Sequence, residues 1–497
     1  MDVSPDGSGT ISSYDFSSPP TGYPTTYTCS LAYGLTATAN TSAGYVFDHW
    51  SILDGTDTTI LTDSAITVEA GNGGKIVTAV FIKPAGSTYL YFPHVDTTSP
   101  WQTEIAVINT GSLTVTGMLK AYSDAGQLVD IIDDVTLAPK GRRQITVASE
   151  FINHTSIGYI VFIASADSVQ GYTKLFKSGI YRAAIPAVAD INTSDIYVSH
   201  IASNSSFWTL IALVNTNSTA KNVTFTFNDG RSAVVTISAY GHKDFTIASL
   251  FGGQEQPDIK SAVISNAAGI IGLELFGTVT YLDGLLLTDQ TVSTIYYPHL
   301  ADVTKWWTGV VAYNTSAARA NITITPYSAE GTALTPSALT IDGLGKYVGV
   351  VKNLNLPAEA AWFRLDASQP VVGFELFGTL DGKQLAAYAD DSGTGAKQGA
   401  FAKLEKSGWT GIAFVNTEGA KATVTLKAHN DSGTVIAIKT ISVNAYAKVV
   451  KMAESIFSPQ SITSATYITF TSDKNVVGFQ LNGSSDSKLL DGLPALN

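Results

Sequence analysis

Short stretches in which apolar and polar residues alternate occur along the whole chain, separated by Gly, Asn, Asp and Pro. Residues 307–378 are an example, with the successive segments WTGVVAYN, ANITITPYS, KYVGVV, AAWFRLD and PVVGFELFG. Alternation with a period of two, in runs rich in β-branched and aromatic residues, predicts half-buried strands. Asp-Gly and Glu-Gly pairs after the second run are typical of tight turns, because glycine tolerates a positive φ. We therefore predict an all-β protein.

The same succession of segments occurs four times, about 100 residues apart. Each copy has a run that ends in Asn-Thr, then a turn that ends in glycine, then an apolar run around a second glycine. The Asn residues are Asn109, Asn215, Asn314 and Asn416, and the second glycines are Gly171, Gly272, Gly373 and Gly478. Landmarks in one order at a near-constant period indicate tandem units. We predict four immunoglobulin-like β-sandwich units of about seven short strands each, at 87–193, 194–293, 294–395 and 396–497.

A short helical turn is expected late in three of these units. The segments are Ala148–Phe151, Ala248–Phe251 and Glu454–Phe457. Between units, segments rich in Ser, Thr, Asp and Gly are expected to act as linkers. The units are therefore expected to follow one another in tandem, with contacts mainly between neighbours. The alternative, in which the units pair into a compact body, stays open.

The first 84 residues follow a different pattern, with Gly44-Tyr45-Val46-Phe47, His49-Trp50 and a final Thr78-Ala79-Val80-Phe81. This stretch resembles the divergent B-repeat modules of bacterial surface proteins, first described in internalins. The resemblance implies a small β-grasp-like module at 1–84 that serves as a spacer or stalk in secreted or wall-anchored proteins. The four later units resemble uncharacterised tandem repeats of large secreted bacterial proteins, a resemblance that implies no activity.

Composition excludes several classes of function. Only 14% of residues are charged and the formal net charge is −12, which argues against a basic nucleic-acid-binding face. No apolar run reaches the ~18 residues that a membrane span needs. The single cysteine, Cys29, can form neither an intrachain disulfide nor a CxxC metal or redox site. The start MDVSPDGSGT has no signal-peptide pattern, so we expect a mature fragment with an added initiator Met.

The tryptophans recur at one place in the repeat, just before a threonine. A tryptophan at the same place in every unit favours a core position. The predicted core tryptophans are Trp50, Trp101, Trp208, Trp307 and Trp409. Trp306, aligned with Phe207, would face the other side of its strand. Aromatic rings that face solvent are typical sugar-stacking surfaces, so Trp306 and Phe207 are the best ligand candidates, with Tyr296 and Tyr297 as helpers. Packing against the adjacent unit is the alternative for Trp306.

The titratable residues that recur at one position of the repeat do not indicate a catalytic site. His94, His200 and His299 share one repeat position with Lys403. Metal sites need converging ligands, so we interpret these residues as hydrogen-bonding groups within the first strand or between units. No nucleophile elbow, zinc motif or phosphate-binding loop is present in the sequence.

One acidic residue in the last apolar run is a candidate catalytic group. Glu375 is matched with Glu274, Lys174 and Gln480, and a catalytic carboxylate is not expected to vary in this way. Glu375 is expected to point outward on a strand whose neighbours Phe374 and Leu376 face inward.

Two acidic stretches could hold Ca²⁺, although solvated turns are the preferred interpretation. They contain Asp54, Asp57 and Asp63, and Asp130, Asp133 and Asp134. Basic residues at a further repeat position are expected to protect strand edges from aggregation. They are Lys140, Arg142, Arg143, His242, Lys243, Lys346 and Lys448.

Taken together, these patterns predict a non-catalytic, modular extracellular protein of bacterial origin, acting in cell-surface structure, adhesion, or filament or matrix assembly. Its expected partners are surface or matrix components, further copies of the chain, or glycans, and neither nucleic acid nor a membrane. No cofactor is expected. The alternative function is a carbohydrate-binding accessory region of a secreted protein.

Overall fold

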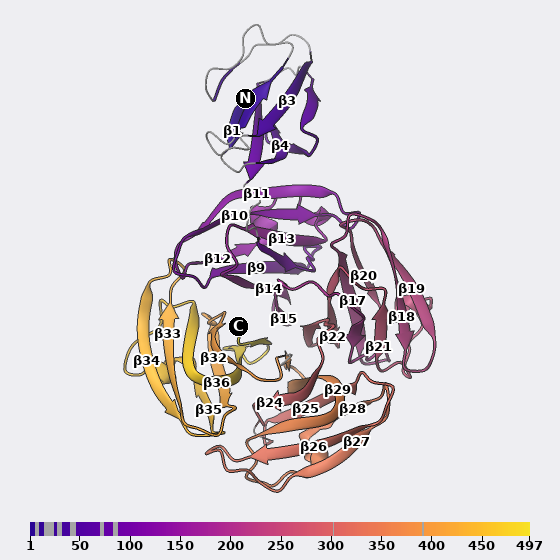
Figure 1. The fold of residues 1–497 in the computed structure, drawn as a ribbon, viewed down its shortest axis with the longest axis vertical. Helices are drawn as coiled ribbons and strands as arrows, with labels where there is room; N and C mark the ends of the chain where they lie inside the picture. Colours follow the sequence, from indigo (N-terminus) through magenta and orange to yellow (C-terminus); the bar gives the residue numbers. More distant parts are fainter. Residues whose placement is uncertain are drawn as a thin grey trace.

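The computed structural model describes residues 1–4, 9–13, 24–26, 32–39, 46–69, 74–82, 88–301, 303–389 and 392–497. The described residues are nearly all strand and turn, which confirms the predicted all-β sandwich repeats. The four repeat units form a closed ring, and the N-terminal module lies outside it (Figure 1). No helix within the described ranges is long and apolar enough to cross a membrane.

The N-terminal module contains two small sheets packed around Trp50, which is fully buried. One sheet has the order β1-β7-β4-β5 and the other the order β2-β3-β6. Their bounds are β1 Asp2–Ser4, β2 Gly9–Ser12, β3 Tyr33–Ala39, β4 Val46–Asp54, β5 Asp57–Leu61, β6 Ala65–Val68 and β7 Lys75–Ile82. Gly44, Tyr45 and Cys29 lie outside the described residues.

Each repeat unit is a sandwich of an outer and an inner sheet. In unit 1 the outer order is β11-β10-β13-β8 and the inner order is β12-β9-β14-β15. The bounds in unit 1 are β8 Thr88–Phe92, β9 Trp101–Asn109, β10 Val115–Tyr122, β11 Leu128–Leu137, β12 Arg142–Thr146, β13 Tyr159–Ala164, β14 Val169–Lys177 and β15 Tyr181–Pro186. Unit 2 repeats this plan with β16-β21-β18-β19 outside and β20-β17-β22-β23 inside. Its bounds are β16 Ile196–Val198, β17 Trp208–Asn215, β18 Lys221–Phe227, β19 Ser232–Ile237, β20 His242–Thr246, β21 Ala262–Ser265, β22 Ile270–Gly277 and β23 Leu282–Leu286.

In units 3 and 4 one long strand runs through both layers and joins them into a single curled sheet of seven strands. The bounds in unit 3 are β24 Val292–Tyr297, β25 Trp306–Asn314, β26 Ala320–Tyr327, β27 Ser337–Ile341, β28 Lys346–Val350, β29 Trp362–Thr379 and β30 Leu385–Ala389. Those in unit 4 are β31 Ala396–Phe401, β32 Gly408–Asn416, β33 Ala422–His429, β34 Val435–Val443, β35 Lys448–Met452, β36 Tyr467–Ser484 and β37 Leu490–Pro494. Unit 2 has a turn where unit 3 has continuous strand, with positive φ at Asn266 and Gly269. Because β24 begins at Val292, the boundary expected between residues 293 and 294 falls inside a strand, and unit 3 begins slightly earlier.

The expected helical turns are present as α1 (Val147–Glu150), η3 (Ala248–Phe251) and α2 (Ala453–Phe457). Unit 3 has an equivalent, η4 (Val351–Leu354), which the sequence did not indicate, and unit 1 has a further short turn, η2 (His154–Ser156).

The Asn-Thr landmark of each repeat ties the end of one strand to two neighbouring turns. The buried side-chain amide of Asn109 donates to the carbonyl oxygens of Leu113 at 2.7 Å and Ala138 at 3.0 Å, and its oxygen accepts the Gly111 N–H at 2.8 Å. Asn215, Asn314 and Asn416 make the same bonds in their units. The strongest sequence signature of the repeat is therefore structural, since each buried amide satisfies several backbone groups.

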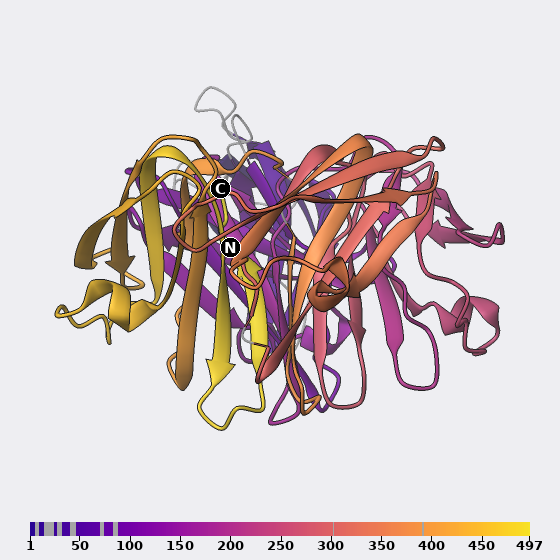
Figure 2. The same cartoon turned by 90° about the horizontal axis from the view of Figure 1, so that it is seen from below.

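The ring closes through its innermost strands. Strand β15 contacts β23, β23 contacts β30, β30 contacts β37, and β37 returns to β15. Seen from the side, many of the strands run along the ring axis (Figure 2). A tandem row in which only sequence neighbours touch is thus wrong for the repeats, because unit 4 packs on unit 1. The N-terminal module packs on the outer sheet of unit 1 through Val80 and an Asp48–Lys120 ion pair.

Candidate functional site

A basic side chain from each unit enters the preceding unit of the ring. It is the first residue of β12, β20, β28 or β35: Arg142, His242, Lys346 or Lys448. Two residues earlier, a non-glycine residue has a positive φ in every unit: Lys140 (59°), Tyr240 (52°), Leu344 (55°) and Tyr446 (55°). This left-handed turn, which is strained for such residues, directs the basic side chain out of its own unit. Expecting these four residues to protect exposed strand edges was therefore wrong, because they lie at interfaces between units.

Three of the four interfaces share a backbone contact, which we call the clasp. It consists of an N–H of the incoming basic residue bonded to a turn carbonyl of the preceding unit. The three bonds are His242 N–H to Asp124 O at 3.1 Å, Lys448 N–H to Ala329 O at 2.9 Å and Arg142 N–H to Asp431 O at 2.9 Å. A turn glycine packs against the incoming backbone in each: a Cβ on Gly126, Gly331 or Gly433 would lie 2.0–2.1 Å from a carbonyl oxygen of the next unit.

The clasp is absent from the described residues of the interface between units 2 and 3. The equivalent glycine, Gly230, faces open space. Lys346 instead donates through its ammonium group to the carbonyl oxygens of Ser199, at 3.3 Å, and of Lys260, and it lies 3.4 Å from His200 Nδ1. This interface is held by side chains where the other three also use backbone.

A buried glutamate accompanies the incoming lysine at two interfaces. Glu274 of unit 2 is 2% exposed and Glu375 of unit 3 is 0% exposed. Burial raises the pKa of Glu274 to about 8 and raises that of Glu375 well above its ordinary value. Burial also lowers the pKa of Lys346 and of Lys448 to about 7. Burial therefore favours the protonated form of both glutamates, and an outward-pointing Glu375 was a wrong expectation.

The strand register also corrects the alignment of this position. Glu274 lies opposite Ile211, four residues before Asn215, and in unit 1 the residue opposite Ile105, four before Asn109, is Thr173. The equivalent of Glu274 in unit 1 is thus the buried Thr173 and not Lys174. Gln480 holds the position in unit 4.

The histidines of the first-strand position also lie at interfaces. His94 Nδ1 is 3.1 Å from His242 Nε2 of the next unit, and His200 contacts Lys346 as described. Burial lowers the pKa of both His94 and His200 to about 3, so both are neutral. His299 packs against Phe377 and Phe479 at the interface between units 3 and 4.

Units 4 and 1 are joined by a buried cluster of two cations and two carboxylates. Asp491 of unit 4 pairs with Lys403 at 2.8 Å and with Arg182 of unit 1 at 2.5 Å, and Arg182 pairs with Glu405 at 2.8 Å. The adjacent Arg182 and Lys403 more than offset the burial of Asp491 and lower its pKa to about 2. The charges balance, as a buried cluster requires.

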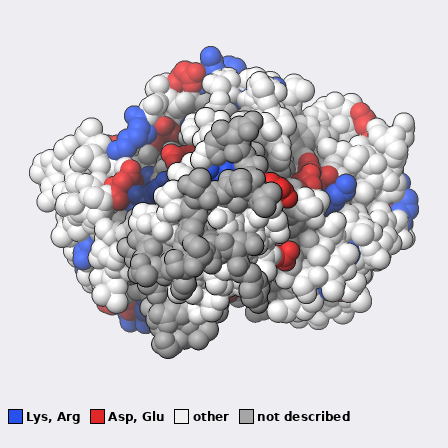
Figure 3. All heavy atoms as spheres, turned by 90° about the horizontal axis from the view of Figure 1, so that it is seen from above, with Lys and Arg blue, Asp and Glu red and all other residues white. Residues whose placement is uncertain are grey.

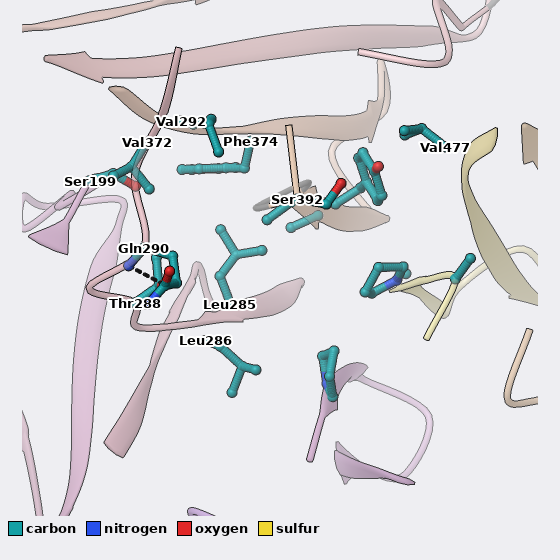
Figure 4. Close-up of a pocket in the computed structure, with 18 of the residues that line it drawn as sticks. Ser199, Leu285, Leu286, Thr288, Gln290, Val292, Val372, Phe374, Ser392 and Val477 are labelled. Atoms are coloured by element: carbon teal, nitrogen blue, oxygen red, sulfur yellow. Dashed lines mark hydrogen bonds between the residues drawn. The ribbon is translucent and has the colours of Figure 1, made fainter. Parts of the chain in front are cut away.

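A cavity of about 230 Å³ lies on the ring axis, where the inner strands end (Figure 4). All four units line it, and unit 1 contributes least. Its apolar walls include Leu285, Val292 and Phe374, and its polar groups include Ser199, Thr288 and Gln290. Glu274 also lines the cavity, and its Oε2 atom has no hydrogen-bond partner. The wall thus combines apolar and polar surface in comparable amounts, and a cavity with apolar walls and convergent polar groups is the usual form of a small-molecule site.

The aromatic residues proposed as sugar-stacking groups are not gathered on one face. Trp306 is half-buried against the interface between units 3 and 4, Tyr296 and Tyr297 are buried, and Phe207 is 38% exposed beside Tyr281 of its own unit. Tyr296 and Tyr297 therefore cannot stack on a sugar in this structure.

The repeat tryptophans are half-buried and lie between units, so the predicted core position holds only for Trp50. Trp208 and Trp307 pack on the preceding unit, and Trp409 has the same register as Trp307. Trp101 lies eight residues before Asn109, the distance of Phe207 and Trp306 from their asparagines. It therefore faces the following unit and was misaligned by one residue.

Neither acidic stretch proposed for Ca²⁺ assembles a ligand group among the described residues. Asp54 pairs with Lys75 at 3.2 Å, and Asp130 accepts the Asn153 N–H at 3.0 Å. In the described part of the chain, one set of three ligand side chains lies close together: Asp124, His242 and Asp244.

The axial cavity was not foreseen from the sequence, although one signal was available. The strand IIGLELFG carries a single acid in an otherwise apolar run, and this acid is Glu274. No protein-family model and no curated protein matches this chain.

Proposed function

We propose that the ring is a non-catalytic binding module that takes a small, largely apolar molecule into its axial cavity. We propose further that it belongs to an extracellular bacterial protein of the cell surface or matrix, with the N-terminal module as its spacer. The observation that supports binding is the cavity itself, which needs side chains from all four units and so exists only in the closed ring.

The chemistry of the wall favours binding over catalysis. Acid–base or nucleophilic catalysis needs at least two reactive groups within hydrogen-bonding reach of the reacting atoms. Apart from Glu274, the side chains of the described lining residues offer hydroxyl, phenol, amide and apolar groups.

The charges on one face of the molecule bear on the class of partner. The face shown in Figure 3 is mostly uncharged, and its acidic and basic side chains are interspersed. Such a surface provides no extended basic area for nucleic acid. Among the described residues, the N-terminal module contacts the ring at unit 1, as a spacer would.

The test is a titration of the full chain with the neutral apolar fluorophore N-phenyl-1-naphthylamine. Saturable binding is expected in the parent. Ala389 is a half-buried lining residue, so Ala389→Phe should fill the cavity and weaken binding at least tenfold. The matched control Ala220→Phe, at an exposed turn, should bind as the parent does. No saturable binding by the folded parent would overturn the proposal, as would equal binding by both variants.

A further inference from the structure

We propose that the ligand of the axial cavity is an organic amine with an apolar body, and that Glu274 is the residue that selects it. This inference rests on the proposed function, because it names the ligand class of the same cavity. It makes Glu274 a binding residue whose partner comes from outside the protein.

The first observation is an unsatisfied buried atom at the cavity wall. Glu274 is 2% exposed, it lines the cavity, and its Oε2 has no hydrogen-bond partner. Buried polar atoms in folded proteins are nearly always hydrogen-bonded, and leaving one unpaired costs about 1–3 kcal/mol. The Glu274 carboxyl group therefore has unused hydrogen-bonding capacity beside the cavity, and an amine bound there would draw on it.

The second observation is the sign of the charge that the titratable side chains of the cavity wall can carry. The titratable side chains among the described lining residues are all acids, namely Glu274, Tyr197 and Tyr388, and none is Lys, Arg or His. The nearest cation, Lys346, already donates to the carbonyl oxygens of Ser199 and Lys260. An anionic ligand would therefore find no positive side chain in the described wall, whereas a cation would find a carboxyl group.

The third observation is the aromatic content of the wall. Phe374, Tyr197 and Tyr388 line the cavity together with the aliphatic residues. Aromatic faces attract ammonium groups by about 0.5–2 kcal/mol, more when water is excluded. The same walls suit an apolar body, because buried apolar surface contributes about 25 cal/mol per Å².

The carboxyl proton of Glu274 is accounted for whether the amine binds in its neutral or its protonated form. A neutral amine takes the carboxyl proton of Glu274, which leaves a carboxylate and an ammonium ion in contact. An ammonium ion binds with release of that proton to solvent. Because Glu274 must ionise in both cases, the affinity for the ammonium form should increase as the pH rises towards about 8.

Unit 3 provides a matched control for this residue. Glu375 holds the equivalent position beside Lys448, as Glu274 does beside Lys346, and it is also fully buried. Glu375 does not line the axial cavity. Replacing Glu375 should therefore leave ligand binding unchanged.

The experiment is calorimetric titration of the full chain with octylamine, 1-octanol and octanoate between pH 6 and pH 9. The parent should bind octylamine at least tenfold more tightly than octanol at pH 9, with a smaller difference at pH 6, and should bind octanoate least. Glu274→Gln should keep octanol binding and lose the preference for the amine, and Glu375→Gln should behave as the parent. The amide is close in shape to the protonated acid, so Glu274→Gln is expected to fold.

Other titratable groups near Glu274 are Lys346, His200, Lys260, Tyr197 and Tyr388. Their titration would persist in Glu274→Gln, so the loss of pH dependence in that variant assigns it to the carboxyl group. In the parent alone, titration at pH 7 in buffers of different ionisation enthalpy should show proton release with octylamine.

The outcomes separate the two proposals. Equal binding of octanol and octylamine would overturn the amine inference and leave the cavity proposal standing. Tighter binding of octanoate, or an unchanged amine preference in Glu274→Gln, would also overturn it. No binding of any of the three compounds would overturn both proposals.

Discussion

The interface between units 2 and 3 and the interface between units 3 and 4 have the same buried groups but are closed differently. Each has a histidine, a glutamate and an incoming lysine at equivalent positions. Between units 3 and 4 the clasp is complete, and the Trp362 indole N–H also donates to Tyr446 O at 3.0 Å. Between units 2 and 3 neither bond is present in the described chain, and the glutamate lines the axial cavity. The buried acid that lines the cavity thus belongs to the interface that lacks the clasp.

The interface between units 2 and 3 lacks the clasp. The free energy of unfolding should therefore depend more on the other three interfaces, such as the one between units 4 and 1. Asp491 and Asp283 hold equivalent positions on β37 and β23. Asp491→Asn should lower the free energy of unfolding by about 3–5 kcal/mol, because it leaves Arg182 and Lys403 buried with one carboxylate fewer. Burial raises the pKa of Asp283 well above its ordinary value, and no cation pairs with it among the described residues, so Asp283→Asn leaves no buried cation without its carboxylate. Chemical denaturation of both variants measures the difference, and equal losses would contradict the asymmetry.

The turn glycines allow a second test of the same comparison. A Cβ on Gly331 would lie 2.0 Å from Ala445 O, whereas a Cβ on Gly230 would meet nothing within 4 Å. Both have a positive φ, 93° and 85°, so alanine strains the backbone equally by about 1 kcal/mol. Gly331→Ala should cost about 2 kcal/mol more than Gly230→Ala, because it also separates the clasp. Thermal unfolding of the two variants gives this difference, and a smaller loss in Gly331→Ala would show that the clasp does not stabilise the interface.

The pH dependence of stability should identify the protonated glutamates. The pKa of Glu274 is about 8 in the folded chain against an ordinary 4.5, so the folded state binds more protons between these values. Its contribution to stability is therefore complete below about pH 4.5 and is lost as the pH rises to about 8. The free energy of unfolding of Glu274→Gln, relative to that of the parent, should therefore increase by about 1 kcal/mol or more across this pH window and stay constant above it.

The free energy of unfolding of Glu375→Gln, relative to that of the parent, should also increase with pH, because burial raises the pKa of Glu375 as well. Octylamine should reduce the gain only for Glu274→Gln, because binding stabilises the ionised Glu274 of the parent. Urea denaturation at several pH values, with and without octylamine, measures both. A gain for Glu274→Gln that is flat with pH would mean that Glu274 is ionised in the folded chain.

The sequence was sufficient for the features that depend on local periodicity. Alternation gave the strands, the repeated landmarks gave the four units, and three of the helical turns were placed within a residue or two. Positions relative to neighbouring units were not predictable, because they depend on how the sheets curl and on which face meets another unit. Trp101 shows how strongly such a prediction depends on the alignment of the repeats, because an error of one residue in a strand moves a side chain to the opposite face. Glu274 does not stand out in the sequence, because Glu375 holds the same position in unit 3, and only the packing between units 2 and 3 places Glu274 at the cavity.

The smallest expected effect concerns the indole bond of the closed interface. Trp362→Phe keeps an aromatic ring against Tyr327, to which Trp362 is stacked at 4.3 Å between centroids, and removes the bond to Tyr446 O. The loss should be about 1–2 kcal/mol, the value for leaving one buried carbonyl oxygen without its donor. The two tyrosines that donate to the equivalent carbonyl oxygens are Tyr159, to Tyr240 O, and Tyr467, to Lys140 O. Tyr159→Phe should have a similar cost when measured by denaturation. If both substitutions were neutral, packing alone would hold these interfaces, and the looser interface between units 2 and 3 would need another cause.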